Sequence, residues 1–547
     1  MQTGLQRLAG RIILSDGWTR ALIAFLAGAV LVLGLAPFNV PAVGFVSFPL
    51  LVWLLDGASG KPGAGLIRRS CPAFRIGWCF GFGYFVAGLW WLGAAILVDG
   101  AEFWWALPLA VFALPMALAI YWGLAAALAR LFWSDGVLRL FAFAASIALF
   151  EGLRGMLLTG FTWNTVGAIA APVPLLMGSV SVVGLNGLTL LSVFVFSLPA
   201  LLVTPARGRA LASVFGVVLV GAHVAYGWWH VSNAPAGHVA GVTLRLVQPN
   251  ILQGQKWDPA EAERIFSRQL ELTQAPMPPA PILQGEGSAE TPSTEPGRRL
   301  VVWPESSFPF ILTQRPDAVA SLAEALGPGD TLIAGATRME GEGAKARFFN
   351  SVYVIGEDGT ILDAQDKLHL VPFGEYLPFQ ALLESWGINQ LTHLPGGFSP
   401  GASRRDLEAG PGGPRFLPLI CYEIIFPGEI GTRATRPDFI LNVTNDAWYG
   451  RTPGPYQHLR QAQLTAVAFG LPLVRAANTG ISIVTDSVGR PVAGLALGQG
   501  GTVDADLPLP GAPTPYARWG EKVFYGLLAL FGLAAVIGYL RFRRSAD

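Results

Sequence analysis

The sequence predicts a membrane-embedded α-helical bundle of about eight spans joined to an external α/β domain. Three observations support this fold class. Only 13% of the 547 residues are charged, whereas about 25% is usual in soluble proteins. Apolar runs follow one another from Ala21 to about Trp229 and return once near the C-terminal end. From Val242 onward, short β-rich runs alternate with polar helices and loops, as in a folded α/β domain.

The apolar runs have the lengths of membrane-spanning helices. A helix needs about 20 apolar residues to cross the hydrocarbon core of a bilayer. The runs lie at 21–37, 43–55, 76–98, 105–128, 138–158, 174–203, 210–228 and 522–540. They divide the chain into a predicted bundle over 1–229, an external domain over 230–520, and a C-terminal span with a short tail over 521–547.

Basic residues lie in alternate loops between these runs, and this alternation predicts the orientation of the chain. The intervening loops, around Asn39, 99–102 and 162–172, contain no lysine or arginine. Because positively charged loops stay in the cytoplasm, we expect both termini there and residues 230–520 outside. The basic loop residues are Arg7, Arg11, Arg20, Lys61, Arg68, Arg69, Arg75, Arg130, Arg139, Arg207, Arg209, Arg541, Arg543 and Arg544.

Charge and cysteine content exclude two classes of protein. A formal net charge of +1 provides no overall field to attract nucleic acid. Three cysteines cannot form a disulfide scaffold, and their spacing matches no zinc signature. In the predicted topology only Cys421 is external, so it is a lone thiol in an oxidising compartment, where a free thiol is unusual. Cys421 therefore needs a functional explanation.

Two charged residues, Glu151 and Arg154, lie inside the fifth apolar run at a spacing of three residues. One interpretation is a polar site near the outer leaflet of the membrane. The other is an ion pair that neutralises both charges and lets them enter the bilayer. We favour the ion pair.

The external segment predicts one α/β domain with a covered sheet. Helices are expected at 258–273, with Asp258 as N-cap, at 316–326 and at about 456–469. Residues 274–298 are rich in Pro, Gly, Ser, Thr and Glu and predict a surface loop. Strands are expected at 242–248, 300–303, 331–337, 351–356, 415–421, 438–444, 472–477 and 481–486.

Three short motifs place reactive side chains at the ends of predicted strands. Glu305 follows the apolar run VVW and a proline, Lys367 begins the sequence KLHLVPFGEY, and Cys421 ends RFLPLIC. Taken singly, the two charged residues fit solvated surface and the cysteine fits core packing. Together they have the parts of nucleophilic acyl transfer: a thiol, a carboxylate to move its proton, and a fixed cation for the oxyanion. Such an oxyanion contact is worth about 3–4 kcal/mol.

The motifs WPE, KxHLVPFGEY and CYE, in that order, resemble the Glu–Lys–Cys triad of the nitrilase, or carbon–nitrogen hydrolase, superfamily. With seven predicted spans before this domain and one after it, the chain resembles the bacterial apolipoprotein N-acyltransferase family over nearly its full length. Residues 274–298 are longer than this family needs, and RTP at 451–453 is an unusual approach to the PYQH motif. Further matches are VQPN (247–250), KW (256–257), NVTNDAWYG (442–450), PYQH (455–458) and RAANTGIS (475–482).

The resemblance implies an αββα sandwich standing on a bundle in the bacterial inner membrane, with the sandwich in the periplasm. It implies that Cys421 attacks the sn-1 ester of a phospholipid, phosphatidylethanolamine in the first instance, and forms a thioester. Glu305 is then the general base, Lys367 stabilises the oxyanion, and Glu375 is a second carboxylate that positions these groups. The acceptor is the α-amino group of a lipoprotein's N-terminal S-diacylglyceryl cysteine, and the kinetics are ping-pong.

Other residues in the matching motifs are candidates for supporting roles. Aromatic and acidic side chains near the nucleophile either line the path of the acyl chain and headgroup or pack in the core. Asn445, Asn478 and Ser482 lie at strand ends and are expected to hold the site by hydrogen bonds. The candidates for the lining are Trp257, Tyr422, Glu423, Trp448 and Tyr449.

The histidines and one apolar segment have alternative interpretations. A Cys–His pair with His369 or His458 is disfavoured, because neither histidine has an evident carboxylate partner in the sequence. The apolar segment is either a loop folded onto the core or, as we favour, a lid that dips into the outer leaflet and admits lipid. Its residues are Phe373, Tyr376, Leu377, Phe379, Leu382, Leu383 and Trp386.

Two competing functions remain open. A membrane-tethered amidase that hydrolyses a soluble amide would use the same three residues, but a tether needs one span rather than about eight. A transporter or receptor would carry charged or broken helices in several spans, and it leaves the three motifs unexplained. The sequence implies no metal and no organic cofactor. We expect a monomer that acts on a phospholipid donor and a lipoprotein acceptor.

Overall fold

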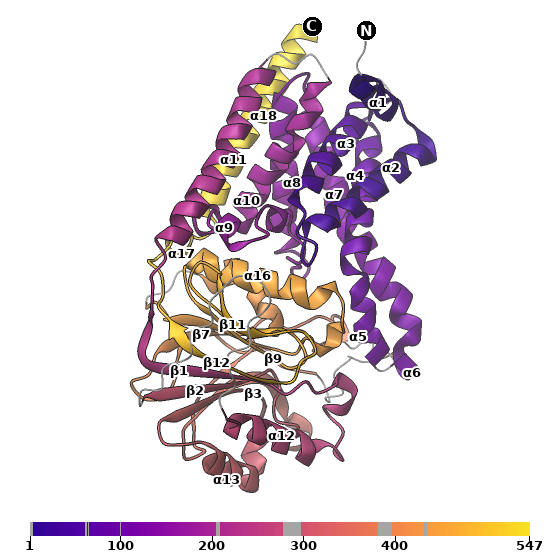
Figure 1. Ribbon diagram of the computed structural model, residues 1–547. Coiled ribbons are helices and arrows are strands. Elements are labelled where there is room, and N and C mark those ends of the chain that lie inside the picture. Colours follow the sequence, from indigo (N-terminus) through magenta and orange to yellow (C-terminus); the bar gives the residue numbers. More distant parts are fainter. Residues whose placement is uncertain are drawn as a thin grey trace. The chain divides into compact units, whose positions relative to one another are not determined.

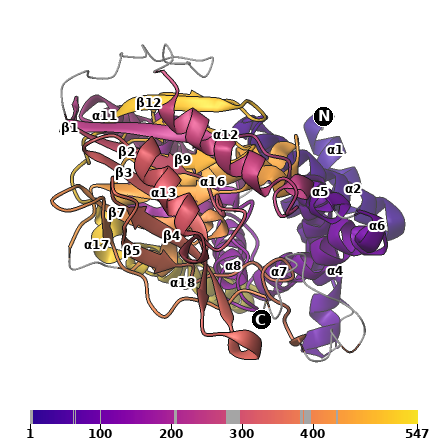
Figure 2. The ribbon, with the colours of Figure 1, turned by 90° about the horizontal axis from the view of Figure 1, so that it is seen from below.

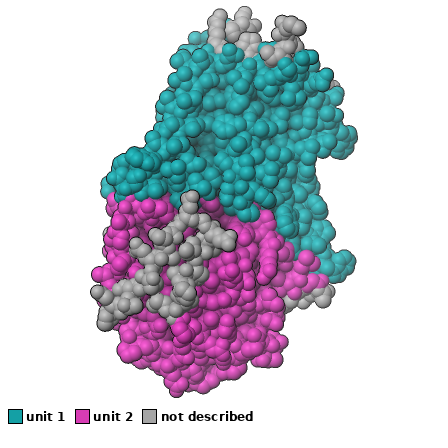
Figure 3. All heavy atoms as spheres, in the orientation of Figure 1, with its two compact units in different colours: residues 1–93, 103–233, 514–547 teal, residues 94–102, 234–513 magenta. Residues whose placement is uncertain are grey.

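The computed structural model describes residues 4–60, 63, 65–98, 100–203, 208–276, 297–380, 385, 397–431 and 435–546 (Figure 1). The chain forms two compact units (Figure 3). Unit 1 comprises residues 1–93, 103–233 and 514–547, and unit 2 comprises residues 94–102 and 234–513. Most of the Pro-rich segment predicted as a loop at 274–298 lies outside the described residues.

Unit 1 is helical throughout its described part. Its long helices are rich in Leu, Ala, Val and Phe, so burial against one another and against lipid satisfies their side chains. The helices are α1 (Gly4–Ile13), α2 (Gly17–Leu31), α3 (Gly44–Asp56), α4 (Leu66–Leu89), α5 (Gly93–Val98), α6 (Gly100–Phe103), α7 (Leu114–Leu131), α8 (Leu138–Arg154), α9 (Pro174–Met177), α10 (Val180–Ser197), α11 (Arg209–Ser232), α17 (Pro515–Trp519) and α18 (Lys522–Ala546). The short α5 and most of α6 are assigned to unit 2.

Six described helical segments, rather than about eight, are long and apolar enough to cross a membrane. The expected spans at 43–55 and 138–158 correspond to α3, with 13 residues, and α8, with 17 residues. At 1.5 Å per residue these helices are about 20 and 25 Å long, shorter than a hydrocarbon core of about 30 Å. The six segments are Gly17–Gly34, Leu66–Val98, Trp104–Leu131, Val180–Leu202, Arg209–Ser232 and Lys522–Arg544.

The charged pair in α8 is buried and fully engaged. Arg154 Nη2 donates to Glu151 Oε2 at 2.8 Å, and Trp122 Nε1 donates to Glu151 Oε1 at 3.1 Å. Arg154 also donates to the main-chain carbonyls of Phe161 and Trp163 in the loop after the helix. This geometry matches the neutralising ion pair favoured from the sequence, and it also fixes that loop.

Unit 2 contains two six-stranded sheets that pack face to face, as the αββα expectation requires. All eight strands predicted from the sequence are present, whereas β5, β6, β11 and β12 were not predicted. The strands of the first sheet, in spatial order, are β12 (Gly501–Pro508), β1 (His238–Gln248), β2 (Arg298–Trp303), β3 (Asp330–Glu340), β4 (Arg347–Ile355) and β5 (Ile361–Asp366). Those of the second are β11 (Pro491–Leu495), β10 (Ser482–Thr485), β9 (Leu473–Ala477), β8 (Phe439–Thr444), β7 (Arg415–Ile420) and β6 (Leu407–Glu408).

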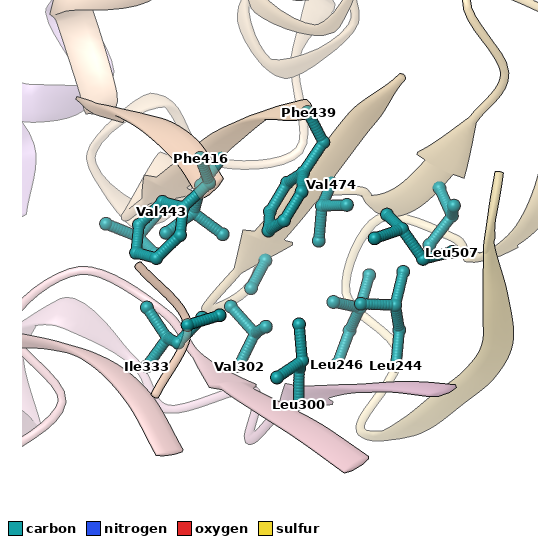
Figure 4. Packing of buried hydrophobic residues seen from close by; sticks show 14 of the residues in the cluster. Leu244, Leu246, Leu300, Val302, Ile333, Phe416, Phe439, Val443, Val474 and Leu507 are labelled. Carbon is teal, nitrogen blue, oxygen red and sulfur yellow. The ribbon is translucent and has the colours of Figure 1, made fainter. Parts of the chain in front are cut away.

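Apolar side chains from both sheets fill the space between them. Leu246 and Val302 of the first sheet and Phe439 and Val474 of the second belong to one buried cluster (Figure 4). A second cluster lies under the helices α12 (Ala262–Gln274) and α13 (Pro316–Ala325), which cover the outer face of the first sheet (Figure 2). Helix α16 (Pro453–Phe469) packs against the second sheet and the turn after β7. Asp258 was predicted as the N-cap of α12, but its Oδ1 accepts a hydrogen bond from the Ala260 amide in a turn before this helix. Helix α12 begins four residues after Asp258.

The two sheets repeat one pattern of strand directions, although no sequence repeat was found. In each sheet three strands run parallel, β1–β2–β3 and β7–β8–β9, and two antiparallel strands follow. Because the carboxyl ends of parallel strands share one edge of a sheet, the residues that follow β2 and β5 lie at one edge of the first sheet. Those that follow β7, β8 and β9 likewise share an edge of the second.

Candidate active site

Glu305, Lys367 and Cys421 each follow a strand, at the edges just described. Glu305 comes two residues after β2, Lys367 directly after β5, and Cys421 directly after β7. All three are buried, with exposed fractions of 6%, 1% and 5%. The fold therefore brings three side chains that are more than 50 residues apart in sequence into one water-poor site.

Lys367 forms the centre of a charged cluster. Its Nζ donates to Glu375 Oε1 at 2.8 Å and lies 3.6 Å from Glu305 Oε1. Burial alone would lower the pKa of Lys367, but Glu375, Glu305 and Cys421 outweigh burial and raise it above its usual value. Lys367 therefore stays protonated at neutral pH, which is a property that an oxyanion-stabilising group needs.

Asn350, on β4, joins the two carboxylates of this cluster. Its Nδ2 donates to Glu305 Oε1 at 2.7 Å and to Glu375 Oε1 at 2.9 Å. Glu375 uses its other oxygen, Oε2, to accept from the Val371 amide at 2.8 Å. One amide group thus sets the distance between the expected base and the expected second carboxylate. Sequence analysis missed Asn350, because nothing in its strand distinguishes it from other buried polar residues.

Cys421 has an unusual backbone conformation. Its φ angle of 51° lies in the left-handed region, which costs a non-glycine residue about 1 kcal/mol or more and is common at functional sites. The residue begins a short 3₁₀ helix, Cys421–Ile425. The carboxylate of Glu423 accepts from the Ile420 amide at 2.8 Å and from the Leu368 amide at 2.9 Å. Glu423 therefore ties the turn at Cys421 to the segment that carries Lys367.

Glu423 is thus engaged in positioning rather than open to substrate. It is 2% exposed, and Arg404 Nη2 also donates to its Oε1 at 2.9 Å. Both carboxylate oxygens of Glu423 already accept hydrogen bonds, so this geometry does not fit the lining role expected from the sequence. Arg404 was not singled out from the sequence, since it lies in a loop without a motif.

The thiol of Cys421 is neutral in the resting site. Burial raises its pKa to about 12, the Glu305 charge adds to this effect, and Lys367 opposes it. Asp446 raises the pKa of Cys421 further, whereas a hydrogen bond from Thr444 lowers it. A thiol of this kind needs a base to take its proton at the moment of attack. Glu305 is the carboxylate whose charge acts most strongly on it.

A buried polar network lies behind Cys421. His458 Nε2 donates to the Cys421 carbonyl at 3.1 Å, and His458 Nδ1 lies 2.9 Å from Asp446 Oδ1. Arg475 Nη2 donates to Asp446 Oδ2 at 2.7 Å, and Arg475 also donates to Asn442 Oδ1. Burial raises the pKa of Asp446, but Arg475 and His458 outweigh burial and lower it to about 2.

The expectation from the sequence that neither histidine has a carboxylate partner was wrong. His458 contacts Asp446, and His369 Nδ1 lies 2.9 Å from Glu429 Oε1. Asp446 precedes His458 by 12 residues, so only the fold reveals the pair. Even so, His458 bonds the main-chain carbonyl of Cys421, and its pKa is lowered by burial and by Arg475. The contact of His458 therefore fixes the backbone of Cys421.

The predicted hydrogen-bonding residues hold loops around the site. Asn478 Nδ2 donates to Asn445 Oδ1 at 3.0 Å and to the Ile251 carbonyl at 2.7 Å. Asn445 Nδ2 donates to Gln253 Oε1 at 2.6 Å. Ser482 accepts from the Ala477 amide at 3.0 Å. These contacts join the ends of β8 and β9 to the loop after β1.

The candidate lining residues differ in exposure. Trp257 is 41% exposed, whereas Tyr422 is 4% exposed. Trp448 and Tyr449 are half-buried, and burial, followed by the charge of Cys421, raises the pKa of Tyr449. Tyr449 is thus coupled electrostatically to Cys421. In the apolar segment, Phe373 and Phe379 are 54% and 84% exposed, while Leu382, Leu383 and Trp386 lie outside the described residues.

Two known protein families match the two parts of this chain. Residues 27–198 match the apolipoprotein N-acyltransferase N-terminal domain, and residues 243–512 match the carbon–nitrogen hydrolase family. The apolipoprotein N-acyltransferase of Brucella melitensis biotype 1 is 48% identical over 547 residues, with 99% of both chains covered. That of Agrobacterium fabrum is 47% identical over 546 residues, with 99% of this chain and 100% of the relative covered.

Fold, site and relatives define a membrane-bound acyltransferase whose second domain is a nitrilase-type αββα sandwich. The full-length identity is specific enough to go one step further. The chain belongs to the apolipoprotein N-acyltransferase family.

Proposed function

We propose that the protein transfers a fatty acyl chain from a phospholipid, through a thioester on Cys421, to the α-amino group of an S-diacylglyceryl cysteine at a lipoprotein N-terminus. One observation carries this proposal: a neutral buried thiol, a carboxylate whose charge acts on it, and a lysine with a raised pKa whose Nζ lies 3.6 Å from that carboxylate. The names of the relatives support the choice of acceptor.

In the first half-reaction Glu305 takes the proton of the Cys421 thiol. The sulfur attacks the carbonyl carbon of the sn-1 ester, and Lys367 stabilises the oxyanion. The carbon–oxygen bond then breaks, the lysophospholipid alcohol takes the proton from Glu305, and the acyl chain stays on sulfur. Phosphatidylethanolamine is the proposed donor.

In the second half-reaction the amine of the acceptor attacks the thioester. Glu305 takes a proton from the amine, Lys367 again stabilises the oxyanion, and the carbon–sulfur bond breaks. The proton on Glu305 returns to the sulfur, so the free thiol is restored and an amide has formed. Two products leave in two separate steps, which gives ping-pong kinetics.

The apolar segment after Lys367 is the proposed entrance for lipid. Phe373 and Phe379 are exposed and have left-handed φ angles of 64° and 55°, so this loop holds aromatic side chains in solvent at a conformational cost. Glu375 anchors the same loop through the Val371 amide while it bonds Lys367. Trp257, Trp448 and Tyr449 are proposed to line the path to the thiol.

The proposed location is the bacterial inner membrane, with unit 2 in the periplasm and both termini in the cytoplasm. The alternating basic loops support this orientation. The alternation of basic and uncharged loops requires that the short helices α3 and α8 also cross the membrane. The bilayer can thin locally around such short helices at a modest cost in free energy. We propose that the chain works as a monomer.

A transfer assay tests the proposed function. Purified protein in detergent is mixed with phosphatidylethanolamine and a diacylglyceryl-cysteinyl peptide, and the mass of the peptide is measured by mass spectrometry. We expect one added fatty acyl group with wild-type protein and with the matched variant Cys79→Ala, and none with Cys421→Ala. Release of free fatty acid without acylated peptide would identify a phospholipid hydrolase instead. Activity only on small soluble amides would identify a tethered amidase.

A further inference from the structure

Lys256 is a buried lysine beside the site that the mechanism above does not use. It follows the short turn Gln253–Gln255 and is 5% exposed. Its Nζ donates to the main-chain carbonyl of Glu305 at 2.8 Å. An ammonium group has three N–H donors, and a buried charge is costly unless it is paired. Among the described residues, no carboxylate forms an ion pair with Lys256.

The other buried lysine of the site is already compensated. Lys367 contacts both Glu375 and Glu305, so two carboxylates lie around one ammonium. With the thiol neutral, the resting site holds two lysines and two carboxylates. When Glu305 takes the thiol proton, its negative charge passes to the sulfur and then to the acyl oxygen, so the negative charge leaves the carboxylate and must be stabilised at a new position. Lys256 is the cation of this set that has no carboxylate partner of its own.

We infer that Lys256 is a second cationic group of the active site, which stabilises the negative charge that develops on Cys421. This inference rests on the proposed role of Cys421 as the nucleophile. The hydrogen bond from Lys256 Nζ to the main-chain carbonyl of Glu305 holds the ammonium beside the proposed general base. The cation and the base are therefore positioned together. A charge fixed in a dry site acts more strongly than the same charge in water.

The titration of Lys256 supports this placement. Burial lowers its pKa to about 8, while the charges of Glu305 and Cys421 raise it. Lys256 is therefore largely protonated at neutral pH and becomes neutral in mild alkali. The other charges that act on Cys421 are those of Glu305, Lys367 and Asp446. The raised pKa of Lys367 and the lowered pKa of Asp446 keep these two groups charged across this range, and the raised pKa of Tyr449 keeps that residue neutral.

The experiment measures the rate at which iodoacetamide alkylates Cys421 between pH 6 and 10. It uses full-length protein in detergent with Cys71→Ser and Cys79→Ser, so that one cysteine reacts. For wild-type Lys256 we expect the rate to rise about tenfold per pH unit near pH 6 but only about threefold between pH 8 and 9. This partial levelling arises because the pKa of the Cys421 thiol rises by about one unit as Lys256 loses its charge. Lys256→Gln should react about tenfold more slowly at pH 7 and show no levelling, which is a pKa increase of about one unit.

Two further variants separate charge from structure. Lys256→Arg keeps a charge that does not titrate, so its rate at pH 7 should stay within about threefold of wild type and show no levelling. Lys345→Gln removes an exposed lysine of the same unit and should change nothing. A Lys256→Gln profile identical to wild type, or equal losses in the Gln and Arg variants, would overturn the inference. The thermal midpoint of each variant shows whether it has folded.

This assay needs no lipid, so it is independent of the transfer assay. If wild-type protein acylates no peptide but the alkylation profiles differ as expected, the proposed function fails and the electrostatic role of Lys256 stands. If the peptide is acylated and the profiles coincide, the proposed function stands and the inference about Lys256 fails.

Discussion

The negative charge of Glu305 has two opposite effects on Cys421. It raises the pKa of the thiol, so it disfavours the thiolate at rest, yet Glu305 is also the proposed base of the reaction. The site therefore keeps the nucleophile protonated until a substrate is bound, which protects a lone thiol from oxidation.

Glu305→Gln separates these two effects. Without the charge the pKa of Cys421 falls, so alkylation by iodoacetamide should be about threefold to tenfold faster at pH 8 than in the wild type. Acyl transfer should fall by at least about 100-fold, because no base remains. Both rates are measured on one preparation. Parallel loss of alkylation and transfer would contradict the assignment of Glu305 as base.

The ion pair of Asp446 and Arg475 is expected to contribute to stability through burial. Both side chains are fully buried, so Asp446→Asn leaves an arginine charge in the protein interior without its carboxylate. We expect a loss of about 3 kcal/mol in the free energy of unfolding, seen as a lower thermal midpoint in detergent. The control Asp317→Asn breaks an exposed pair with Arg315 and should cost less than about 1 kcal/mol. Equal effects would refute the argument from burial.

At the scale of elements, β3 holds Glu305 in place by lying unusually close to it. Gly335 of β3 donates its amide to the Pro304 carbonyl and accepts from the Ser307 amide. A Cβ atom at position 335 would lie 2.5 Å from the Cα atom of Glu305. The turn that follows β2 can therefore rest on β3 only if position 335 has no side chain.

Gly335→Ala should displace Glu305 without unfolding the sheet. We expect acyl transfer to fall by about tenfold to 100-fold, since a misplacement of about 1 Å near reacting atoms can cost this much. The thermal midpoint should change by only a few degrees. The matched variant Gly428→Ala, where a Cβ meets nothing within 4 Å, should keep wild-type transfer. A fully active Gly335→Ala protein would show that the close contact does not position Glu305.

How far the sequence predicts these elements depends on what each contains. Runs of apolar residues predict strands such as β2, β7 and β8 correctly, and the short motifs predict the reactive residues that follow β2 and β7. β5, with the sequence ILDAQD, was missed because half of its residues are polar and it lies at a sheet edge. Asn350, Lys256 and Arg475 were not assigned to the site, since their partners lie 25 or more residues away.

At the scale of the whole molecule, the helical unit differs most from its prediction. Run length alone suggested about eight spans, whereas six segments of the described part of the chain meet the length and composition of a span. Periodicity does not show where a helix ends inside an apolar run. In α10 the predicted run is interrupted at Gly184, whose φ of 67° is not helical.

The proposed orientation can be tested with single cysteines. Cys71, in the first turns of α4, should react with a membrane-impermeant maleimide only after spheroplasts are permeabilised, because the basic residues around it predict a cytoplasmic position. The protein would carry Cys79→Ala and Cys421→Ala. A companion variant without Cys71 but with Arg268→Cys on α12 should react in intact spheroplasts. Labelling of Cys71 in intact spheroplasts would reverse the orientation.

The most direct test of covalent transfer is the mass of the intact protein after incubation with phosphatidylethanolamine. We expect wild-type protein to gain the mass of one fatty acyl group, to lose it in hydroxylamine, and to lose it on addition of a diacylglyceryl-cysteinyl peptide. Cys421→Ala should gain nothing. Acylated peptide that forms without any adduct on wild-type protein in single-turnover time courses, or an adduct that persists in Cys421→Ala, would contradict a thioester on Cys421.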